Sequence, residues 1–169
     1  MPNRIAYMPL SSYPEAPPDA AILASMGFGK SLGCGLHVAI FGMDIPPVAS
    51  PMGSFLINVE GMALAAEARS KAESDRLQTL VEGEGRRGMS VQVTNQQVVM
   101  GASQDVAASE ARYFDLALLP WSTETLSTQD MAQSLVFGSG IPVILVPPTA
   151  PQGPVDHIAI AWDGSRVAA

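Results

Sequence analysis

Short apolar segments alternate along the chain with longer segments of helical periodicity. Most of the short segments are almost continuously apolar, as in strands buried on both faces of a sheet, whereas residues 89–99 start with a period-two alternation, as a strand near a sheet edge does. The longer segments repeat apolar residues at helical spacing. Strands that alternate with helices are typical of βαβ units, whose strands are parallel. The sequence therefore predicts an α/β protein with a Rossmann-like or flavodoxin-like five-stranded parallel sheet and helices on both faces. The expected strands are residues 4–10, 36–45, 89–99, 114–121 and 142–148.

Four helices are expected between these strands. Asp19 is well placed to cap the first helix, which should end at the glycines found between positions 27 and 35. The second helix is Ala- and Glu-rich and should be the longest, with glycines 83, 85 and 88 ending it. The expected ranges are 20–26, 59–84, 104–113 and 128–137.

An apolar loop follows the second strand, from Pro46 to about Ser54, and is expected to pack against the domain. Three methionines lie in or around it, namely Met43, Met52 and Met62. They could line a pocket or contact a partner, because methionine adapts to irregular surfaces, but packing in the core is the simpler interpretation.

Composition and charge restrict the possible functions. With 47% hydrophobic and 15% charged residues the chain is expected to fold, and a net charge of −7 disfavours nucleic acid and anionic membranes as partners. The basic residues are scattered apart from the pair Arg86 and Arg87. No apolar run approaches the roughly 20 residues of a membrane-spanning helix. The single cysteine, Cys34, allows no internal disulfide, so a cytoplasmic location is expected.

Three segments of the second half resemble the universal stress protein family in its tandem arrangement. They are FDLALLPW (114–121), SGIPVILVPP (139–148) and HIAIAWDGSRVAA (157–169). The resemblance implies that residues 1–150 form one universal-stress-protein-like domain. Residues 155–169 would be the first strand and turn of a second, truncated domain of the same type. Because one strand cannot bury its own apolar faces, we expect residues 157–162 to be covered by a sheet edge or another chain.

The nucleotide motif of that family is absent from the expected place. Members that bind ATP carry G-x2-G-x9-G followed by Ser or Thr after the fourth strand, where backbone N–H groups reach the phosphates. Here the fourth strand is followed by Pro120, Trp121, Ser122, Thr123 and Glu124, and the next glycine is Gly138. Proline lacks an N–H, tryptophan is bulky and glutamate repels phosphate. The first domain is therefore predicted to have no cofactor, and Met8, Pro9 and Leu10 occupy the place of the family's first-strand aspartate.

The turn after residues 157–162 does fit the family arrangement. Asp163, Gly164 and Ser165 are the candidate cofactor-binding residues, with the carboxylate at the end of a strand, glycine in the turn and serine at a helix start. The resemblance implies that ATP could bind in a complete second domain. The same three residues also form an ordinary turn and cap, and the two interpretations stay open.

Two other glycine-containing segments have simpler explanations. Residues 24–31 (ASMGFGKS) fit a permissive phosphate-binding loop, but such a loop must follow a strand and open a helix, whereas this one ends a helix. Lys30 is thus expected to be solvated near a helix C-terminus. Gly138, Ser139 and Gly140 are expected to cap the last helix with a left-handed glycine.

No further group of residues indicates catalysis. His37 and His157 are too isolated for a metal site, and Cys34 lies between glycines as a small buried residue. The hydroxyl-rich loop with Ser122, Thr123, Thr125, Ser127 and Thr128 should cap the next helix, and binding of a small anion or phosphorylation is the alternative.

Two hypotheses follow. The first is a non-catalytic stress-response protein whose first domain is a structural and dimerising module. The resemblance implies pairing through the fifth strand, within a tandem pair or as a homodimer, by Val143, Ile144, Leu145 and Val146. The second is a weak ATPase or nucleotidyl-transferring enzyme that uses Asp163 and Ser165, although phosphate-binding glycines and a metal-holding carboxylate are not evident.

Overall fold

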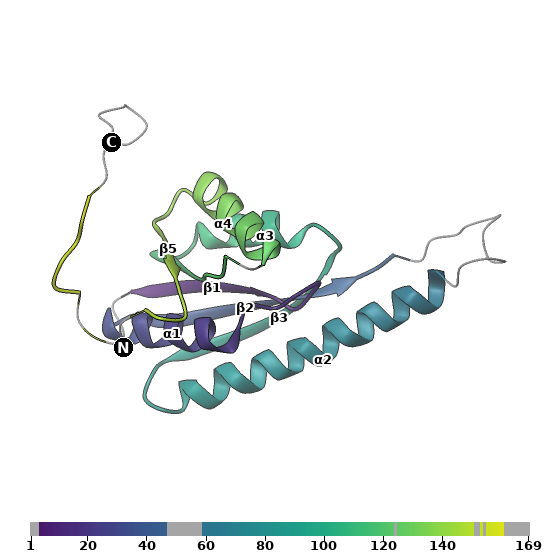
Figure 1. The fold of residues 1–169 in the computed structure, drawn as a ribbon, viewed down its shortest axis with the longest axis horizontal. Coiled ribbons are helices and arrows are strands. Elements are labelled where there is room, and N and C mark those ends of the chain that lie inside the picture. Colours follow the sequence, from purple (N-terminus) through teal and green to yellow (C-terminus); the bar gives the residue numbers. More distant parts are fainter. Residues whose placement is uncertain (1–3, 47–58, 124, 151–152, 154, 161–169) are drawn as a thin grey trace.

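The computed structural model describes residues 4–46, 59–123, 125–150, 153 and 155–160. Five strands and four helices alternate along this part of the chain (Figure 1). They are β1 (Ile5–Ser11), α1 (Asp19–Ser31), β2 (Gly35–Asp44), α2 (Val59–Gly85), β3 (Val91–Val99), α3 (Ser103–Ala111), β4 (Leu116–Pro120), α4 (Leu126–Gly138) and β5 (Val143–Val146). The predicted α/β fold with a five-stranded parallel sheet is confirmed.

The strand order is β3-β2-β1-β4-β5, and every neighbouring pair is parallel. The chain builds the sheet outward from β1 to β3 and then returns to the other side of β1 for β4 and β5. Right-handed crossovers place the helices of the two halves on opposite faces. Accordingly α1 and α2 lie below the sheet in Figure 1, and α3 and α4 lie above it.

Each face of the sheet has its own apolar core. The face covered by α1 and α2 buries residues such as Met8, Val38 and Leu118, with Ile22 and Leu77 from the helices. The opposite face buries Tyr7, Phe41 and Leu119 against small residues of α3 and the apolar side of α4. Because both faces of the central strands are covered, β1 and β4 are buried along almost their whole length, which explains their continuous apolar sequences.

Helix α1 corrects two details predicted from the sequence. Asp19 is its first residue rather than its cap, Pro18 occupies the N-cap position, and the Asp19 carboxylate accepts hydrogen bonds from Arg76 at 2.8 and 3.0 Å. The helix also continues through Gly27 and Gly29 to Ser31, and it ends before Gly33, which has a φ of 70°. A Cβ atom on Gly29 would lie 2.9 Å from Leu118 Cδ1, so this glycine allows α1 to approach β4 closely.

Helix α4 ends as expected. Gly138 is its last residue and Gly140 has a φ of 73°, the left-handed conformation that was predicted at this cap. Ser139 donates from its hydroxyl to the Leu135 carbonyl at 2.5 Å. These residues therefore finish a helix, and they lie away from the carboxyl ends of the strands.

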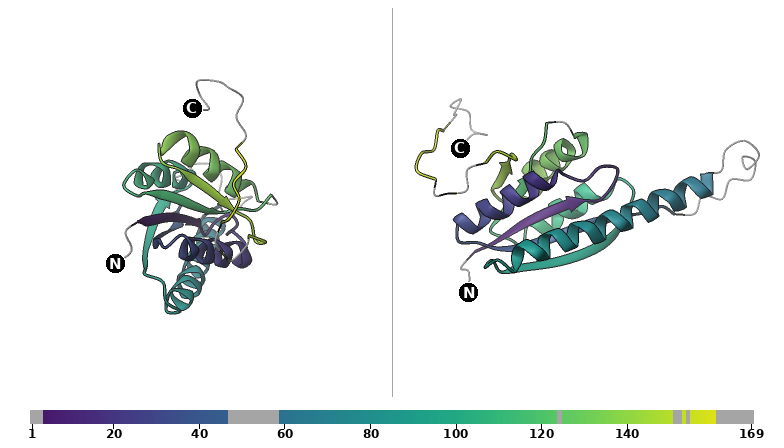
Figure 2. Two further views of the ribbon diagram at one scale, coloured as in Figure 1. Left: turned by 90° about the vertical axis from the view of Figure 1, so that its left-hand side faces the viewer. Right: turned by 60° about the horizontal axis from the view of Figure 1, so that its bottom comes forward.

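The segment that follows β5 differs from its prediction. Residues 155–160 form no strand, and the side chains of Ile158 and Ile160 are 81% and 86% exposed. A strand needs a hydrogen-bonding neighbour, and this segment has none among the described residues. Figure 2 shows it running outside the sheet and helices. The division into domains 1–150 and 155–169 remains a prediction.

Candidate functional site

Parallel α/β sheets bind ligands at the carboxyl ends of their strands, at the point where the strand order reverses. In this chain that point lies between β1 and β4. A second opening lies at the same edge of the sheet, beyond the ends of β2 and β3. We call the first the switch-point crevice and the second the edge pocket.

The β1 side of the switch-point crevice is closed by hydrogen bonds. Ser12 donates from its hydroxyl to the Phe41 carbonyl at 3.0 Å and bonds the Ser70 hydroxyl at 2.7 Å. Ser70, which belongs to α2, accepts the backbone N–H of Met43 at 2.8 Å. One buried serine of α2 thereby joins the ends of β1 and β2. The Ser12 hydroxyl is therefore engaged within the protein.

The β4 side of the crevice is closed in the same way. Pro120 ends the strand and has no N–H, and the N–H of Trp121 donates to the Val146 carbonyl at 2.9 Å. In the hydroxyl-rich loop, Thr125 and Thr128 bond each other at 2.6 Å, and Ser127 donates to the Glu15 carbonyl at 3.3 Å. Thr125 occupies the N-cap position of α4, as expected, but its hydroxyl bonds that of Thr128 and makes no capping hydrogen bond. Glu124 lies outside the described residues.

The space left in the switch-point crevice is about 10 Å³. Proline rings, Leu119 and Met131 fill it, together with the hydroxyl side chains at the start of α4; the lining residues are Pro9, Ser11, Pro17, Leu119, Ser127, Thr128 and Met131. Such a volume suits one water molecule at most. No phosphate group can enter without displacing these residues.

The edge pocket is much larger, about 280 Å³, and mainly apolar. Its wall consists of the last residues of β2 and β3, the loop after β1 and the start of α3; the lining residues are Tyr13, Pro14, Phe41, Gly42, Met43, Val98, Val99, Met100, Gly101, Ser103 and Gln104. None of them carries a formal charge. The pocket therefore suits a small uncharged group with an apolar or aromatic surface.

Two glycines shape this pocket. A Cβ atom on Gly42 would collide with the Gln97 side-chain amide, so Gln97 can lie across β2 only because position 42 has no side chain. Gly101 has a φ of 86° and turns the chain from β3 into α3. The polar groups nearby are Ser103 and Gln104, whose side chains bond each other at 3.1 Å. Met43 lines the pocket and is only 7% exposed. It therefore both borders a pocket and packs in the core, the two interpretations that the sequence offered.

A cluster of hydrogen-bonded polar side chains on the α3 side of the sheet has a structural role. The buried Tyr7 hydroxyl donates to Glu110 at 2.9 Å, and Gln96 donates to the other oxygen of the same carboxylate at 2.6 Å. Burial raises the pKa of Tyr7 far above its ordinary value, and the charge of Glu110 and the hydrogen bond to it raise it further. Tyr7 thus remains a neutral donor. Its ring stacks at 5.0 Å from that of Phe114.

His37 belongs to the same cluster. It bonds the Thr94 hydroxyl at 3.2 Å through Nε2, and its ring centroid is 5.0 Å from that of Phe114. His157 lies in the exposed segment 155–160. Within the described part of the chain, no group of three His, Cys, Asp or Glu residues is arranged to hold a metal ion. No described helix is both long and apolar enough to cross a membrane.

Comparison with known proteins adds to this geometry. No family model and no curated protein matches the sequence. Solved structures do match. A protein from the universal stress protein family of Burkholderia pseudomallei has a TM-score of 0.50 and 13% identity, over 84% of this chain and 96% of that one. The hypothetical protein MJ0577 has a TM-score of 0.52 and 14% identity, over 83% of this chain and 94% of that one. The chain has a universal stress protein-like fold.

The predicted cofactor-binding residues stay a prediction. Asp163, Gly164 and Ser165 lie outside the described residues. Met52 and most of the apolar loop around it do so as well, and Met62 is 66% exposed on α2. The edge pocket was only partly predicted, through Met43. The signal that could have revealed it is the pair of glycines at positions 42 and 101, each at the end of a strand.

The two remaining candidate residues, Lys30 and Cys34, have structural positions away from any site. Lys30 is exposed in the last turn of α1 and donates to the Arg87 carbonyl at 3.1 Å, far from the carboxyl ends of the strands. Cys34 is buried before β2, and burial raises the pKa of its thiol, with a lowering effect from Arg4 and a raising effect from Asp115. A buried, protonated thiol is a poor nucleophile.

Proposed function

We propose that this domain is a non-catalytic structural and dimerising module of a universal stress protein-like stress-response protein, and that it does not bind the phosphates of ATP. The observation that carries the proposal is the filled switch-point crevice of about 10 Å³. A phosphate needs several N–H donors and room for its oxygens. Here Pro120 has no N–H, and the N–H of Trp121 is engaged by Val146.

Titration calorimetry tests this part of the proposal. We expect no heat of binding when ATP and Mg²⁺ are added to the chain, and no release of phosphate on incubation. Adenosine is the informative control, because it presents the same base and sugar without charge. Tight binding of ATP that adenosine does not reproduce would contradict the proposal, since it would require a phosphate site.

A second candidate function is binding of a small uncharged ring compound in the edge pocket. The volume of about 280 Å³ and the apolar wall with Phe41, Met43 and Val98 favour it. This pocket is near the lower end of the range of ~300–1,000 Å³ usual for small-molecule sites, so the ligand would be small. Adenosine that binds as well as ATP, with a loss of both in Val98→Asp, would support this function.

The alternative of a weak ATPase or nucleotidyl-transferring enzyme requires a phosphate cradle and a carboxylate for a metal ion. Its candidate residues Asp163 and Ser165 lie outside the described residues. The proposal therefore assigns any ATP binding to a complete second domain. Phosphate release by the chain that is lost in Asp163→Asn would favour the enzyme instead.

Pairing through β5 completes the proposal. β5 stands at one end of the sheet, its described strand neighbour is β4, and Leu145 is 40% exposed. Unpaired backbone groups and an apolar side chain favour pairing with a second β5, from a second domain or another chain. We expect Leu145→Lys to weaken self-association measured by sedimentation velocity, while Leu126→Lys, at a 76% exposed position of α4, leaves it unchanged.

A further inference from the structure

The opposite edge of the sheet, formed by β3, has features that the proposed function does not use. β3 is nine residues long, contains no charged residue and no proline, and has β2 as its strand neighbour in the described part of the chain. We propose that β3 is a second interaction edge, where two copies of this chain pair antiparallel about a twofold axis at Asn95.

The first support is that β3 lacks the usual protection of an edge strand. Exposed edges are commonly guarded by charges, proline, bulges or short length. The sequence VQVTNQQVV has none of these, and its register with β2 is regular over all nine residues. β5 at the other end of the sheet has only four residues. β3 thus offers the longer row of backbone groups to a partner strand.

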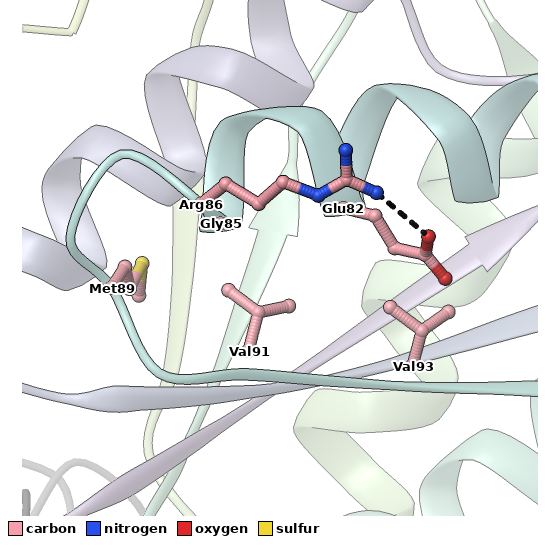
Figure 3. Close-up of a pocket in the computed structure, with 6 residues that line it drawn as sticks. All are labelled: Glu82, Gly85, Arg86, Met89, Val91 and Val93. Atoms are coloured by element: carbon pink, nitrogen blue, oxygen red, sulfur yellow. Dashed lines mark ion pairs between the residues drawn. The ribbon is translucent and has the colours of Figure 1, made fainter.

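The second support is a hollow beside the amino half of β3 (Figure 3). It measures about 420 Å³ and is lined by Glu82, Gly85, Arg86, Met89, Val91 and Val93. The floor is apolar, formed by Val91 and Val93, and the rim carries Arg86 and Glu82, whose charged groups are 3.9 Å apart. A Cβ atom on Gly85 would lie 2.9 Å from Val91, so the end of α2 approaches the strand closely.

The third support is the apolar surface at the other end of the same strand. Val99 is 51% exposed and Met100 is 65% exposed. In an antiparallel pair centred on Asn95, Val99 of each copy stands opposite Val91 of the other. Both residues have odd numbers, so they lie on the same face of the extended sheet. Each copy would then cover the hollow of the other with Val99, as an isologous interface requires.

The fourth support is the distribution of charge. Arg86 and Arg87 lie before the amino end of β3, with exposed side chains of 80% and 76%. Asp44 is opposite Val99 on β2, and Asp105 lies in the first turn of α3, so the carboxyl end is acidic. Each arginine already forms an ion pair at the end of α2, Arg86 with Glu82 at 3.9 Å and Arg87 with Glu84 at 2.7 Å. Antiparallel pairing would bring these two guanidinium groups toward Asp44 and Asp105 of the other copy, twice by symmetry, so charge favours this orientation modestly.

Cysteine cross-linking tests the pairing and its register in the full chain. In Asn95→Cys the two new thiols face each other across the axis, where opposite Cα atoms are about 4.5–5.5 Å apart, within reach of a disulfide. With a mild added oxidant we expect a covalent dimer as the main product. Gln97→Cys is the matched control on the same strand, because the two copies of position 97 would lie about 14 Å apart along the strand. Cys34 is buried and takes no part.

Mixing two variants checks the register by a second route. Gln97→Cys combined with Val93→Cys should give a heterodimer, because these positions face each other. All cross-links should form equally well with Leu145→Lys present, which separates this edge from β5. Equal cross-linking of Asn95→Cys and Gln97→Cys, or none in either, would overturn the proposal.

Sedimentation velocity of charge variants at position 95 tests the pairing without cross-linking. With Leu145→Lys present to weaken pairing through β5, Asn95→Lys places two like charges on the axis and should lower the remaining self-association at least tenfold, and an equal mixture with Asn95→Glu should restore it. Folding of each variant is checked by circular dichroism. Self-association unchanged in folded Asn95→Lys, or not restored in the mixture, would also overturn the proposal.

Discussion

Two openings at the carboxyl edge of the sheet, the switch-point crevice and the edge pocket, differ although they are built from neighbouring strands. Between β1 and β4 about 10 Å³ remains, whereas the pocket beyond β2 and β3 keeps about 280 Å³. Prolines and mutually bonded hydroxyl groups fill the first, and glycines at positions 42 and 101 leave room in the second. The strand order thus determines where a crevice can form at the edge of the sheet. The residues of the adjoining loops determine whether that crevice is open or filled.

Helix α2 connects the two openings. Ser70 bonds Ser12 at the end of β1 and Met43 at the end of β2, and Glu67 accepts the N–H of Ile45 at 2.8 Å. Polar groups at the ends of β1 and β2 are therefore held by this helix. Leu119→Ala in the crevice should lower the stability of the protein most, Ser70→Ala in this connection less, and Gly42→Ala in the edge pocket less again.

The largest effect is expected from Leu119→Ala, which empties the closed crevice. Leu119 is 1% exposed and packs with Met131 on the α4 face. Its truncation should lower the free energy of unfolding by about 3 kcal/mol, because the removed side chain leaves a cavity in the core. Denaturation with urea measures this value. Leu126→Ala is the control, since Leu126 is 76% exposed and should change stability by less than ~0.5 kcal/mol. Equal losses would show that the crevice is not tightly filled.

The sequence predicted the fold well because both faces of the central strands are buried. Its apolar segments indicated β1, β2, β4 and β5, and the period-two alternation of residues 89–99 indicated β3. The extent of α1 was missed because Gly29 serves close packing against Leu118 rather than a turn. The strand expected from residue 157 was wrong for residues 157–160, because an apolar alternating pattern forms no strand without a neighbour.

The edge pocket could be predicted only in part for a related reason. Its lining comes from four separate segments that the fold brings together, and only Met43 was noted in advance. A sequence reports the periodicity of each segment but not the empty space between segments. The polar cluster of Tyr7, Glu110 and His37 was missed likewise, because β1, α3 and β2 contribute one residue each.

The next effect concerns the connection made by Ser70. Ser70→Ala should lower stability by about 2 kcal/mol, because the buried N–H of Met43 and the hydroxyl of Ser12 both lose a partner. Ser74 is a matched control one turn later on α2, also buried, whose hydroxyl atom makes no hydrogen bond in the structure. Ser74→Ala should be neutral or slightly stabilising. The same thermal or urea unfolding measures both, and an equal cost in both variants would mean that burial alone matters at position 70.

A smaller effect is expected in the open pocket. Gly42→Ala forces the Gln97 side chain to move, because the new methyl group would lie within 2.9 Å of its amide carbon. The cost should be about 1 kcal/mol, since Gln97 is flexible and exposed. Gln97→Ala in the same chain should remove most of that cost. Gly83→Ala is the control, because nothing lies within 4 Å of its added Cβ and α2 should gain about 0.5–1 kcal/mol. A cost that persists in the double variant would place the strain in the backbone instead.

The smallest effect separates hydroxyl bonding from apolar filling as the cause of the closed crevice. Ser127 donates to the Glu15 carbonyl at 3.3 Å in an exposed position, so Ser127→Ala should cost less than ~0.5 kcal/mol. Thr128→Ala, by contrast, removes a buried partner of Thr125 and should cost about 1 kcal/mol. Neither variant should gain binding of ATP in calorimetry, because prolines, Leu119 and Met131 still occupy the space. If Ser127→Ala alone acquired ATP binding, one weak surface hydrogen bond would be what holds the crevice shut, and its filling by apolar groups would be the wrong explanation.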